Sequence, residues 1–382
     1  MLPVQRAFIA LFLMVFTLFL AGGCTSTGGD SSVPLNFAGS DMYWKVLGSY
    51  GFSPGAVEHT SLAFQGSAPC VAFTDNNNNN KATVMKYQGG AWTALGAAGF
   101  SAGSCTSPSL AIQSSVPYVA FIDGANAGKA TVMKYDVNGW ALYGAAGFSP
   151  GAVESPSIAI HNGVPYVGFV DVANGRKPSV WYYSGGAWQQ IGTINAAVGG
   201  SASNLMLKVY EGTPYVAFVD QGYGNKATVM KYSGNTWEYV GLPGCSAGEV
   251  ECICLAIPDG VAYIAFKDNA NGGSPLVMRL REGAWEGMGP GIAFSASEVN
   301  AVSLQVYRGT PYVAFSDRSV SGKASVMAYD LGIWKYLGQQ GFSPGGAGST
   351  SLHIYSGVLY LAFKDNANSG KASLMYFPYP MN

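Results

Sequence analysis

The stretch WTALGAAGFSAGSCTSPSLAIQSSVPYVAFIDGANAGKATVMKYDVNG, residues Trp92–Gly139, decides the fold because the chain repeats it. Four short segments are rich in β-branched and aromatic residues: Ser109–Ile112, Pro117–Asp123, Ala130–Tyr135 and, at the start of the next copy, Trp140–Gly144. Clusters of Gly, Asn, Ser and Asp separate these segments, as they do between strands joined by tight turns. Helical spacing is absent. Each copy is therefore predicted to form four strands.

Tryptophan marks the same register along the whole chain. Seven of the eight tryptophans follow one another at spacings of 48, 48, 48, 49, 48 and 49 residues. They are Trp44, Trp92, Trp140, Trp188, Trp237, Trp285 and Trp334. Four strands per repeat of about 40–50 residues are typical of a β-propeller, whereas open β-solenoids usually have shorter coils and atypical end caps. The sequence predicts an all-β, seven-bladed propeller with four antiparallel strands per blade.

The two ends of the repeat array complement each other. Residues 41–47 form a fourth-type strand with no first three strands before it. The last copy supplies three strands, ending at Ser373–Phe377, and has no tryptophan strand after them. An N-terminal strand that completes the last blade would remove an open sheet edge. We therefore expect a closed ring over residues 41–382.

The repeated modules GFSPG, PYVAF-x-D and KATVMKY resemble those of bacterial surface and secreted repeat β-propellers. The resemblance extends over residues 41–382. It implies the fold and says little about the ligand, because propellers carry many unrelated functions.

The N-terminal segment is predicted to be an export signal. Arg6 precedes an apolar run from Ala7 to Leu20, which is short for a membrane-spanning helix of about 20 residues and suits a signal peptide. The sequence Leu20-Ala21-Gly22-Gly23-Cys24 resembles the bacterial lipobox, although Ala21 stands where Leu or Val is usual. The resemblance implies cleavage after residue 23 and lipidation of Cys24; an ordinary secretory signal is the alternative. Residues 24–40 are rich in Gly and Ser and are expected to be a flexible tether.

Composition limits the classes of partner. The chain of 382 residues has 20 Lys and Arg against 21 Asp and Glu, a net charge of −1. No basic patch for nucleic acid follows from this balance. Apolar residues make up 48%, which excludes an intrinsically disordered chain. The expected partners are a membrane, through the lipid anchor, and a glycan or surface protein; the chain is expected to be monomeric, in the cell envelope, at the outer membrane or cell surface.

An aspartate ends the second strand of every repeat. The functional interpretation is a ring of carboxylates that binds Ca²⁺ or sugar hydroxyls, and the structural interpretation is an Asx turn that caps backbone N–H groups. A residue present in all seven repeats usually builds the blade, so the structural interpretation is favoured. The seven residues are Asp75, Asp123, Asp171, Asp220, Asp268, Asp317 and Asp365.

Irregular positions are further candidates for a ligand site. Glu58, Glu154 and Glu251 occupy one crossover position in different repeats, and Trp181 replaces a residue of the VMKY core. Carboxylates near the mouth of a ring could bind a ligand or act as acid and base in a glycosidase, whereas solvated loop charge is the plainer alternative. No recognised catalytic or metal-binding motif is present. No cofactor and no metal are expected.

Five cysteines remain after Cys24, an odd number. An exported protein permits disulfides. Cys245 is a candidate to pair with Cys252 or Cys254, and Cys70 with Cys105 in the adjacent blade, which leaves at least one thiol over.

The function predicted from sequence is an exported, lipid-anchored propeller that binds or scaffolds at the cell surface without catalysis. A propeller enzyme that acts on polysaccharide and a purely structural envelope protein are the alternatives.

Overall fold

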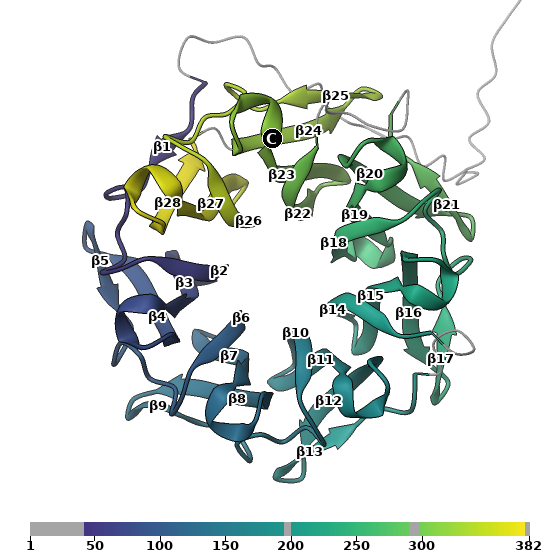
Figure 1. Ribbon diagram of the computed structural model, residues 1–382, viewed down its shortest axis with the longest axis horizontal. Coiled ribbons are helices and arrows are strands. Elements are labelled where there is room, and N and C mark those ends of the chain that lie inside the picture. The colour runs from purple at the N-terminus through teal and green to yellow at the C-terminus, as the bar shows by residue number, and fades with distance from the viewer. Residues whose placement is uncertain (1–41, 195–199, 290–297, 379–382) are drawn as a thin grey trace, which may run out of the picture. The chain divides into compact units, whose positions relative to one another are not determined.

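The computed structural model describes residues 42–194, 200–289 and 298–378. In this part of the chain, 28 strands form seven four-stranded antiparallel sheets, arranged as blades around a common axis (Figure 1). The predicted seven-bladed propeller is confirmed. The predicted signal peptide, Cys24 and the tether lie outside the described residues. No helix in the described ranges is both long enough and apolar enough to cross a membrane.

Each blade is numbered here by its order along the chain, and its first strand lies innermost. The innermost strands of blades 1 to 7 are β2 (Val57–Gln65), β6 (Cys105–Gln113), β10 (Val153–His161), β14 (Ala202–Tyr210), β18 (Val250–Ala256), β22 (Val299–Tyr307) and β26 (Ala347–Tyr355). The second strands are β3 (Ala68–Asp75), β7 (Val116–Asp123), β11 (Val164–Asp171), β15 (Thr213–Asp220), β19 (Tyr263–Asp268), β23 (Thr310–Asp317) and β27 (Val358–Asp365).

The third and fourth strands complete each blade toward the outside of the ring. The third strands are β4 (Lys81–Gln88), β8 (Lys129–Asp136), β12 (Lys177–Ser184), β16 (Lys226–Ser233), β20 (Ser274–Arg281), β24 (Lys323–Asp330) and β28 (Lys371–Phe377). The fourth strands are β5 (Ala91–Ala94), β9 (Gly139–Leu142), β13 (Ala187–Gln190), β17 (Thr236–Tyr239), β21 (Ala284–Gly287), β25 (Ile333–Tyr336) and β1 (Lys45–Val46).

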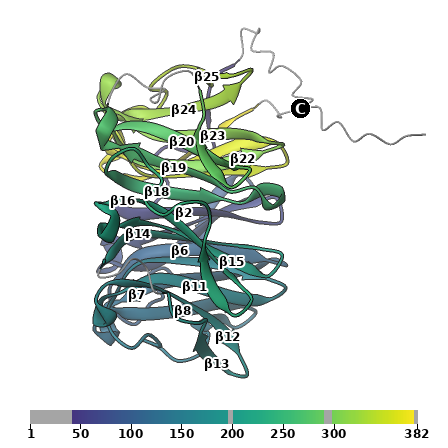
Figure 2. The same cartoon turned by 90° about the vertical axis from the view of Figure 1, so that its right-hand side faces the viewer.

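Short 3-10 helices join the second strand of each blade to the third. They are η1 (Asn76–Asn78), η2 (Gly124–Asn126), η3 (Val172–Asn174), η4 (Gln221–Tyr223), η6 (Asn269–Asn271), η7 (Arg318–Val320) and η8 (Asn366–Asn368). An eighth, η5 (Pro258–Gly260), joins β18 to β19 instead. The strands run between the two faces of the ring (Figure 2). The seven helices that join second to third strands therefore lie on the same face as the crossovers between blades. This face is called the η face below.

The ring closes as predicted. Strand β1 pairs antiparallel with β28, with Lys45 opposite Tyr376 and Val46 opposite Met375. Trp44 beside it is 5% exposed, and its indole Nε1 donates to the carbonyl of Leu337 in blade 6 at 2.8 Å. The N-terminal strand therefore completes blade 7 and also fastens it to its neighbour.

The core is divided among the seven interfaces between consecutive blades. Each buried apolar cluster draws its side chains from two adjacent blades; one, for example, joins Val71 and Phe73 of blade 1 to Ala362 and Leu374 of blade 7. The near-continuous apolar second strands explain this arrangement, because both faces of each sheet are covered. Small residues such as Ala72, Ala120 and Ala217 are fully buried at these contacts.

The periodic tryptophans have a shared structural role. The Nε1 atom of each donates to a backbone carbonyl of the preceding blade, for example Trp92 to Leu47 at 2.9 Å and Trp140 to Leu95 at 2.7 Å. The crossover phenylalanine stacks on the same ring: Phe100 lies 4.1 Å from Trp140, centroid to centroid. The tryptophans therefore clamp neighbouring blades together, and the stacked phenylalanine covers one face of the indole at Trp44, Trp92, Trp140 and Trp188.

Candidate functional site

The repeated aspartates are engaged within their own blades. All seven are at most 4% exposed. In six of them one carboxylate oxygen accepts the backbone N–H two residues later, as Asp75 does from Asn77 at 3.1 Å. The second oxygen of Asp75 accepts from Asn78 at 2.7 Å and from Thr83 at 2.8 Å. This geometry favours the structural interpretation, because a carboxylate occupied by three donors has little capacity left for a ligand.

Asp171 and Asp220 depart from this pattern, because each has a buried carboxylate oxygen without a partner among the described residues. Asp171 caps η3 without a side-chain hydrogen bond, and its unpartnered oxygen is Oδ1. No group of three or more His, Cys, Asp or Glu side chains in the described ranges is placed to hold a metal ion.

The three predicted glutamates lie at corresponding positions on the innermost strands β2, β10 and β18, at the η face. Each is paired with a cation. Glu58 accepts from Lys364 of blade 7, and Glu154 forms a two-point ion pair with Arg176 of its own blade. No hydrogen bond or ion pair joins any two of the three glutamates among the described residues. The fold keeps them in separate blades.

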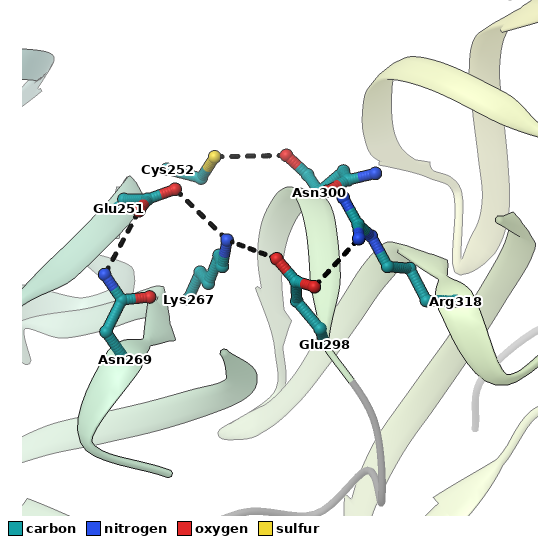
Figure 3. Close-up of polar contacts among 7 residues, drawn as sticks. All are labelled: Glu251, Cys252, Lys267, Asn269, Glu298, Asn300 and Arg318. Carbon is teal, nitrogen blue, oxygen red and sulfur yellow. Dashed lines mark hydrogen bonds and ion pairs between the residues drawn. The ribbon is translucent and has the colours of Figure 1, made fainter. Parts of the chain in front are cut away.

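Glu251 belongs to a larger network between blades 5 and 6 (Figure 3). The ammonium of Lys267 lies 3.2 Å from Glu251 and 2.9 Å from Glu298, so that one cation bridges two blades. Arg318 lies 2.9 Å from the other oxygen of Glu298. Asn269 donates to Glu251 at 3.1 Å. Four charged side chains and an amide therefore fill this interface at the η face.

Arg318 extends the network toward the next interface. Its second guanidinium nitrogen donates to Oδ1 of Asn300 at 3.1 Å, and the thiol of Cys252 donates to the backbone carbonyl of the same residue at 3.2 Å (Figure 3). Asn300 is the blade 6 counterpart of Glu58, Glu154 and Glu251. The hydrogen bonds from Arg318 and Cys252 hold Asn300 in place, and Asn300 also borders the interface between blades 6 and 7.

Hydrogen bonds set the ionisation of the network. Donation by Asn269, assisted by Lys267, lowers the pKa of Glu251 below its ordinary value of 4.5. The hydrogen bond from Lys267 lowers the pKa of Glu298 in the same way, and Glu298 in return raises the pKa of Lys267 above 10.5. All three groups are charged at neutral pH. A glycosidase acid needs a raised pKa, so Glu251 is poorly suited to donate a proton.

The interface between blades 6 and 7 is open where the others carry larger side chains. A pocket of about 360 Å³ opens there, next to Asn300. Glycines 346 and 348 stand where blade 6 has Glu298 and Asn300. The polar side chains of the pocket are neutral amides and hydroxyls; they belong to Asn300, Ser316, Ser321, Ser349 and Asn366.

The pocket presents both donors and acceptors. Ser316 donates to the carbonyl of Gly322 at 2.9 Å, which fixes its hydroxyl at the buried end of the pocket. Asn300, Ser321 and Asn366 are exposed around it. Amides and hydroxyls that both donate and accept are suited to a neutral polyhydroxy ligand.

Trp181 contributes to packing. It lies on β12, donates from Nε1 to Oγ of Ser179 at 3.0 Å and contacts the ring of Phe148 with centroids 5.9 Å apart. It is far along the ring from the pocket, in blade 3. The structure does not bring it together with the glutamates through any hydrogen bond.

The cysteine pairings are corrected by the structure. All five described cysteines, Cys70, Cys105, Cys245, Cys252 and Cys254, are free thiols. Cys245 donates to the carbonyl of Ala227 in blade 4, whereas Cys254 donates to Val302 in blade 6 at 3.0 Å, so the two thiols face different neighbours. Cys70 and Cys105 are buried in one cluster of blades 1 and 2 without a bond between them.

Sequence reasoning missed the pocket residues, because Ser and Asn in loops are common throughout the chain. One signal was present. When the repeats are aligned on the strand-ending aspartate, blade 7 has glycine at two positions where blade 6 has Glu298 and Asn300. Two glycines in place of larger residues at the interface between blades 6 and 7 indicate a space there that side chains fill at the other interfaces.

Comparison with known proteins supports the fold. No protein-family model matches the chain, and no curated protein sequence matches it. Among solved structures, the chain is similar to an ulvan lyase, a polysaccharide lyase bound to a saccharide of GlcA and Rha3S: identity is 13%, the TM-score is 0.56, and 87% of this chain and 96% of the lyase are covered. A lectin from Aleuria aurantia in complex with alpha-methyl-L-fucoside is 15% identical with a TM-score of 0.48, covering 77% of this chain and 100% of the lectin. The likeness to the lyase, at 13% identity, shows the β-propeller fold and nothing finer.

Proposed function

We propose that this chain is a non-enzymatic carbohydrate-binding propeller, exported and held at the cell envelope through a lipidated Cys24. The observation that carries the binding proposal is the pocket between blades 6 and 7, whose polar side chains are neutral hydroxyls and amides. Its volume of about 360 Å³ is at the lower end of the range of about 300–1,000 Å³ that small-molecule sites occupy. The ligand is therefore one end or one short segment of a glycan.

The electrostatics of the pocket favour a neutral sugar. Lys267, Glu298 and Arg318 neutralise one another on the blade 5 side, and Lys364 is paired with Glu58 on the blade 1 side. No charged side chain lines the pocket itself. Its lining has no aromatic ring either, so hydrogen bonds supply the recognition. The proposal is supported by the likeness in fold to the ulvan lyase, which is bound to a saccharide.

The test is a glycan array followed by calorimetric titration of the full chain with the glycans that score. Gly348→Val fills the pocket: a Cβ at Gly348 has its nearest neighbour, Cβ of Lys364, at 3.6 Å, which is ordinary contact. We expect this variant to fold normally and to lose binding by tenfold or more, a loss of about 1.4 kcal/mol.

The matched control is Ser203→Val, the same position on β14 of blade 4. It should bind as the unchanged chain does. An array without any hit, or binding that survives Gly348→Val undiminished, would refute the site. Anchoring is tested separately: Cys24→Ala should abolish acyl labelling and release the chain from membranes, and unchanged membrane association would contradict the anchor.

A further inference from the structure

A tier of corresponding residues surrounds the axis of the ring, away from the pocket. The innermost strands enclose this axis (Figure 1). On each of them one residue pairs with the second residue of the second strand's PYVAF-type segment, so all seven lie at one level. These residues are Ala63, Ala111, Ala159, Lys208, Ala256, Gln305 and His353. They are called the axial tier.

The axial tier has alanine in blades 1, 2, 3 and 5 and a polar side chain in blades 4, 6 and 7. Four of its members are alanines, whose side chains are short, and all members except Ala63 are partly exposed, so solvent reaches this level. Lys208 is its only cation. Gln305 and His353 supply an amide and an imidazole at the same height. The charge of Lys208 contributes to the lowered pKa of His353, so the two side chains come near each other although they belong to blades 4 and 7.

Lys208 has no ionic partner. None of the ion pairs among the described residues includes it. Burial lowers the pKa of its amine, even though the side chain is partly exposed. The two observations agree if the strands of the ring enclose the amine while the rest of the side chain stays partly exposed. An ammonium without a counter-ion in such surroundings is costly.

The titratable groups that face Lys208 do not supply the missing charge. Burial raises the pKa of Cys254 to about 12, and its thiol donates to the carbonyl of Val302. Burial and the charge of Lys208 lower the pKa of His353 to about 4, so its imidazole is neutral at pH 7. Tyr215 lies opposite Lys208 on β15. None of these is a carboxylate.

We propose that a small monovalent anion, a carboxylate or a halide, binds at the axial tier against the Lys208 ammonium. The amide of Gln305, at the same level, completes the site. A single negative charge matches the single cation, whereas a dianion would leave an excess charge inside the ring. Because the bound anion favours the charged amine, binding takes up a proton and raises the pKa of Lys208. Affinity is full below that pKa and falls about tenfold per pH unit above it.

The experiment titrates the full chain with sodium acetate, sodium chloride and sodium phosphate at constant ionic strength, with the melting temperature and NMR line broadening of ¹³C-acetate as readouts. We expect saturable binding of acetate or chloride at pH 6.5 that weakens above the pKa of Lys208. Binding of both assigns a general monovalent-anion site, and binding of acetate alone assigns a carboxylate site. Dianionic phosphate that binds more tightly than either would overturn the argument from charge.

Lys208→Met removes the charge and keeps the side-chain length. It should abolish saturable binding and, because an unpaired ammonium is lost, should not lower the melting temperature. Lys231→Met, on β16 of the same blade, is the matched control and should bind as the unchanged chain does. Gln305→Ala keeps the charge and should weaken binding in part. Binding that is equal in Lys208→Met and in the unchanged chain would end the proposal, and the glycan proposal would be unaffected.

Discussion

Two neighbouring interfaces of the same ring differ in how they end at the η face. Between blades 5 and 6, Lys267 bridges Glu251 and Glu298 and closes the surface with charge. Between blades 6 and 7, glycines 346 and 348 leave a neutral pocket. The strands and the buried aspartates are the same in both. The difference shows that the repeat builds the scaffold and that substitutions within it decide where a pocket forms.

Trp44→Ala tests how much the N-terminal closing segment stabilises the interface between blades 6 and 7. Of the substitutions considered, it should lower stability the most. Trp44 is buried, stacks on Phe342 at 4.3 Å and donates to Leu337. Its truncation should lower the free energy of unfolding by about 3–5 kcal/mol, measured by urea denaturation. Trp285→Ala, at the half-buried equivalent in blade 5, is the control and should cost less. Equal losses of unfolding free energy in the two variants would show that ring closure adds no stability beyond that of an ordinary blade interface.

Exchanging the side chains of the two interfaces sharpens the comparison. Ser316→Lys with Gly346→Glu installs in blades 6 and 7 the pair that Lys267 and Glu298 form one interface earlier. The pocket should fill and glycan affinity should fall at least about tenfold, or 1.4 kcal/mol.

The reverse exchange, Lys267→Ser with Glu298→Gly, should open a second cavity between blades 5 and 6 without removing the first. Crystal structures of both variants check the shapes, and calorimetry checks the affinities. Retained binding in the filled variant would separate the glycan site from this pocket.

Lys267→Met should have the smallest effect. Its two carboxylate partners keep solvent contact, so the loss is at most about 1 kcal/mol. Because hydrogen bonds hold the pKa of Glu251 below 4.5, its contribution to stability is complete above pH 4.5 and is lost as the pH falls through the lowered value. Lys267, with a raised pKa, contributes fully below pH 10.5 and loses its contribution above its folded pKa.

The acid-induced loss of stability should therefore be smaller in Lys267→Met than in the unchanged chain, as measured by urea denaturation between pH 3 and pH 7. Identical pH profiles for the two proteins would mean that the network does not couple to folding.

Much of the architecture was predictable because it is periodic. Tryptophan spacing fixed the number of blades, and the incomplete copies at the two ends predicted that β1 would pair with β28. The recurrence of Asp75 and its counterparts favoured a local cap, and the hydrogen bonds to Asn77, Asn78 and Thr83 agree with that interpretation. Each of these features depends on a short segment or on its repetition, which a sequence displays directly.

The partners of individual side chains were decided only by the tertiary structure. Glu58 meets Lys364 across 306 positions of the chain, and Cys245 turns toward Ala227 instead of a second thiol. Lys208 and His353 come under each other's influence only because the innermost strands curve around one axis. Sequence alone thus determined the ring, since strand pattern and burial are local and repeated. Closure of that ring determined which charges are neutralised, which glycines leave a pocket and which amine is left unpaired, since these depend on distances between blades.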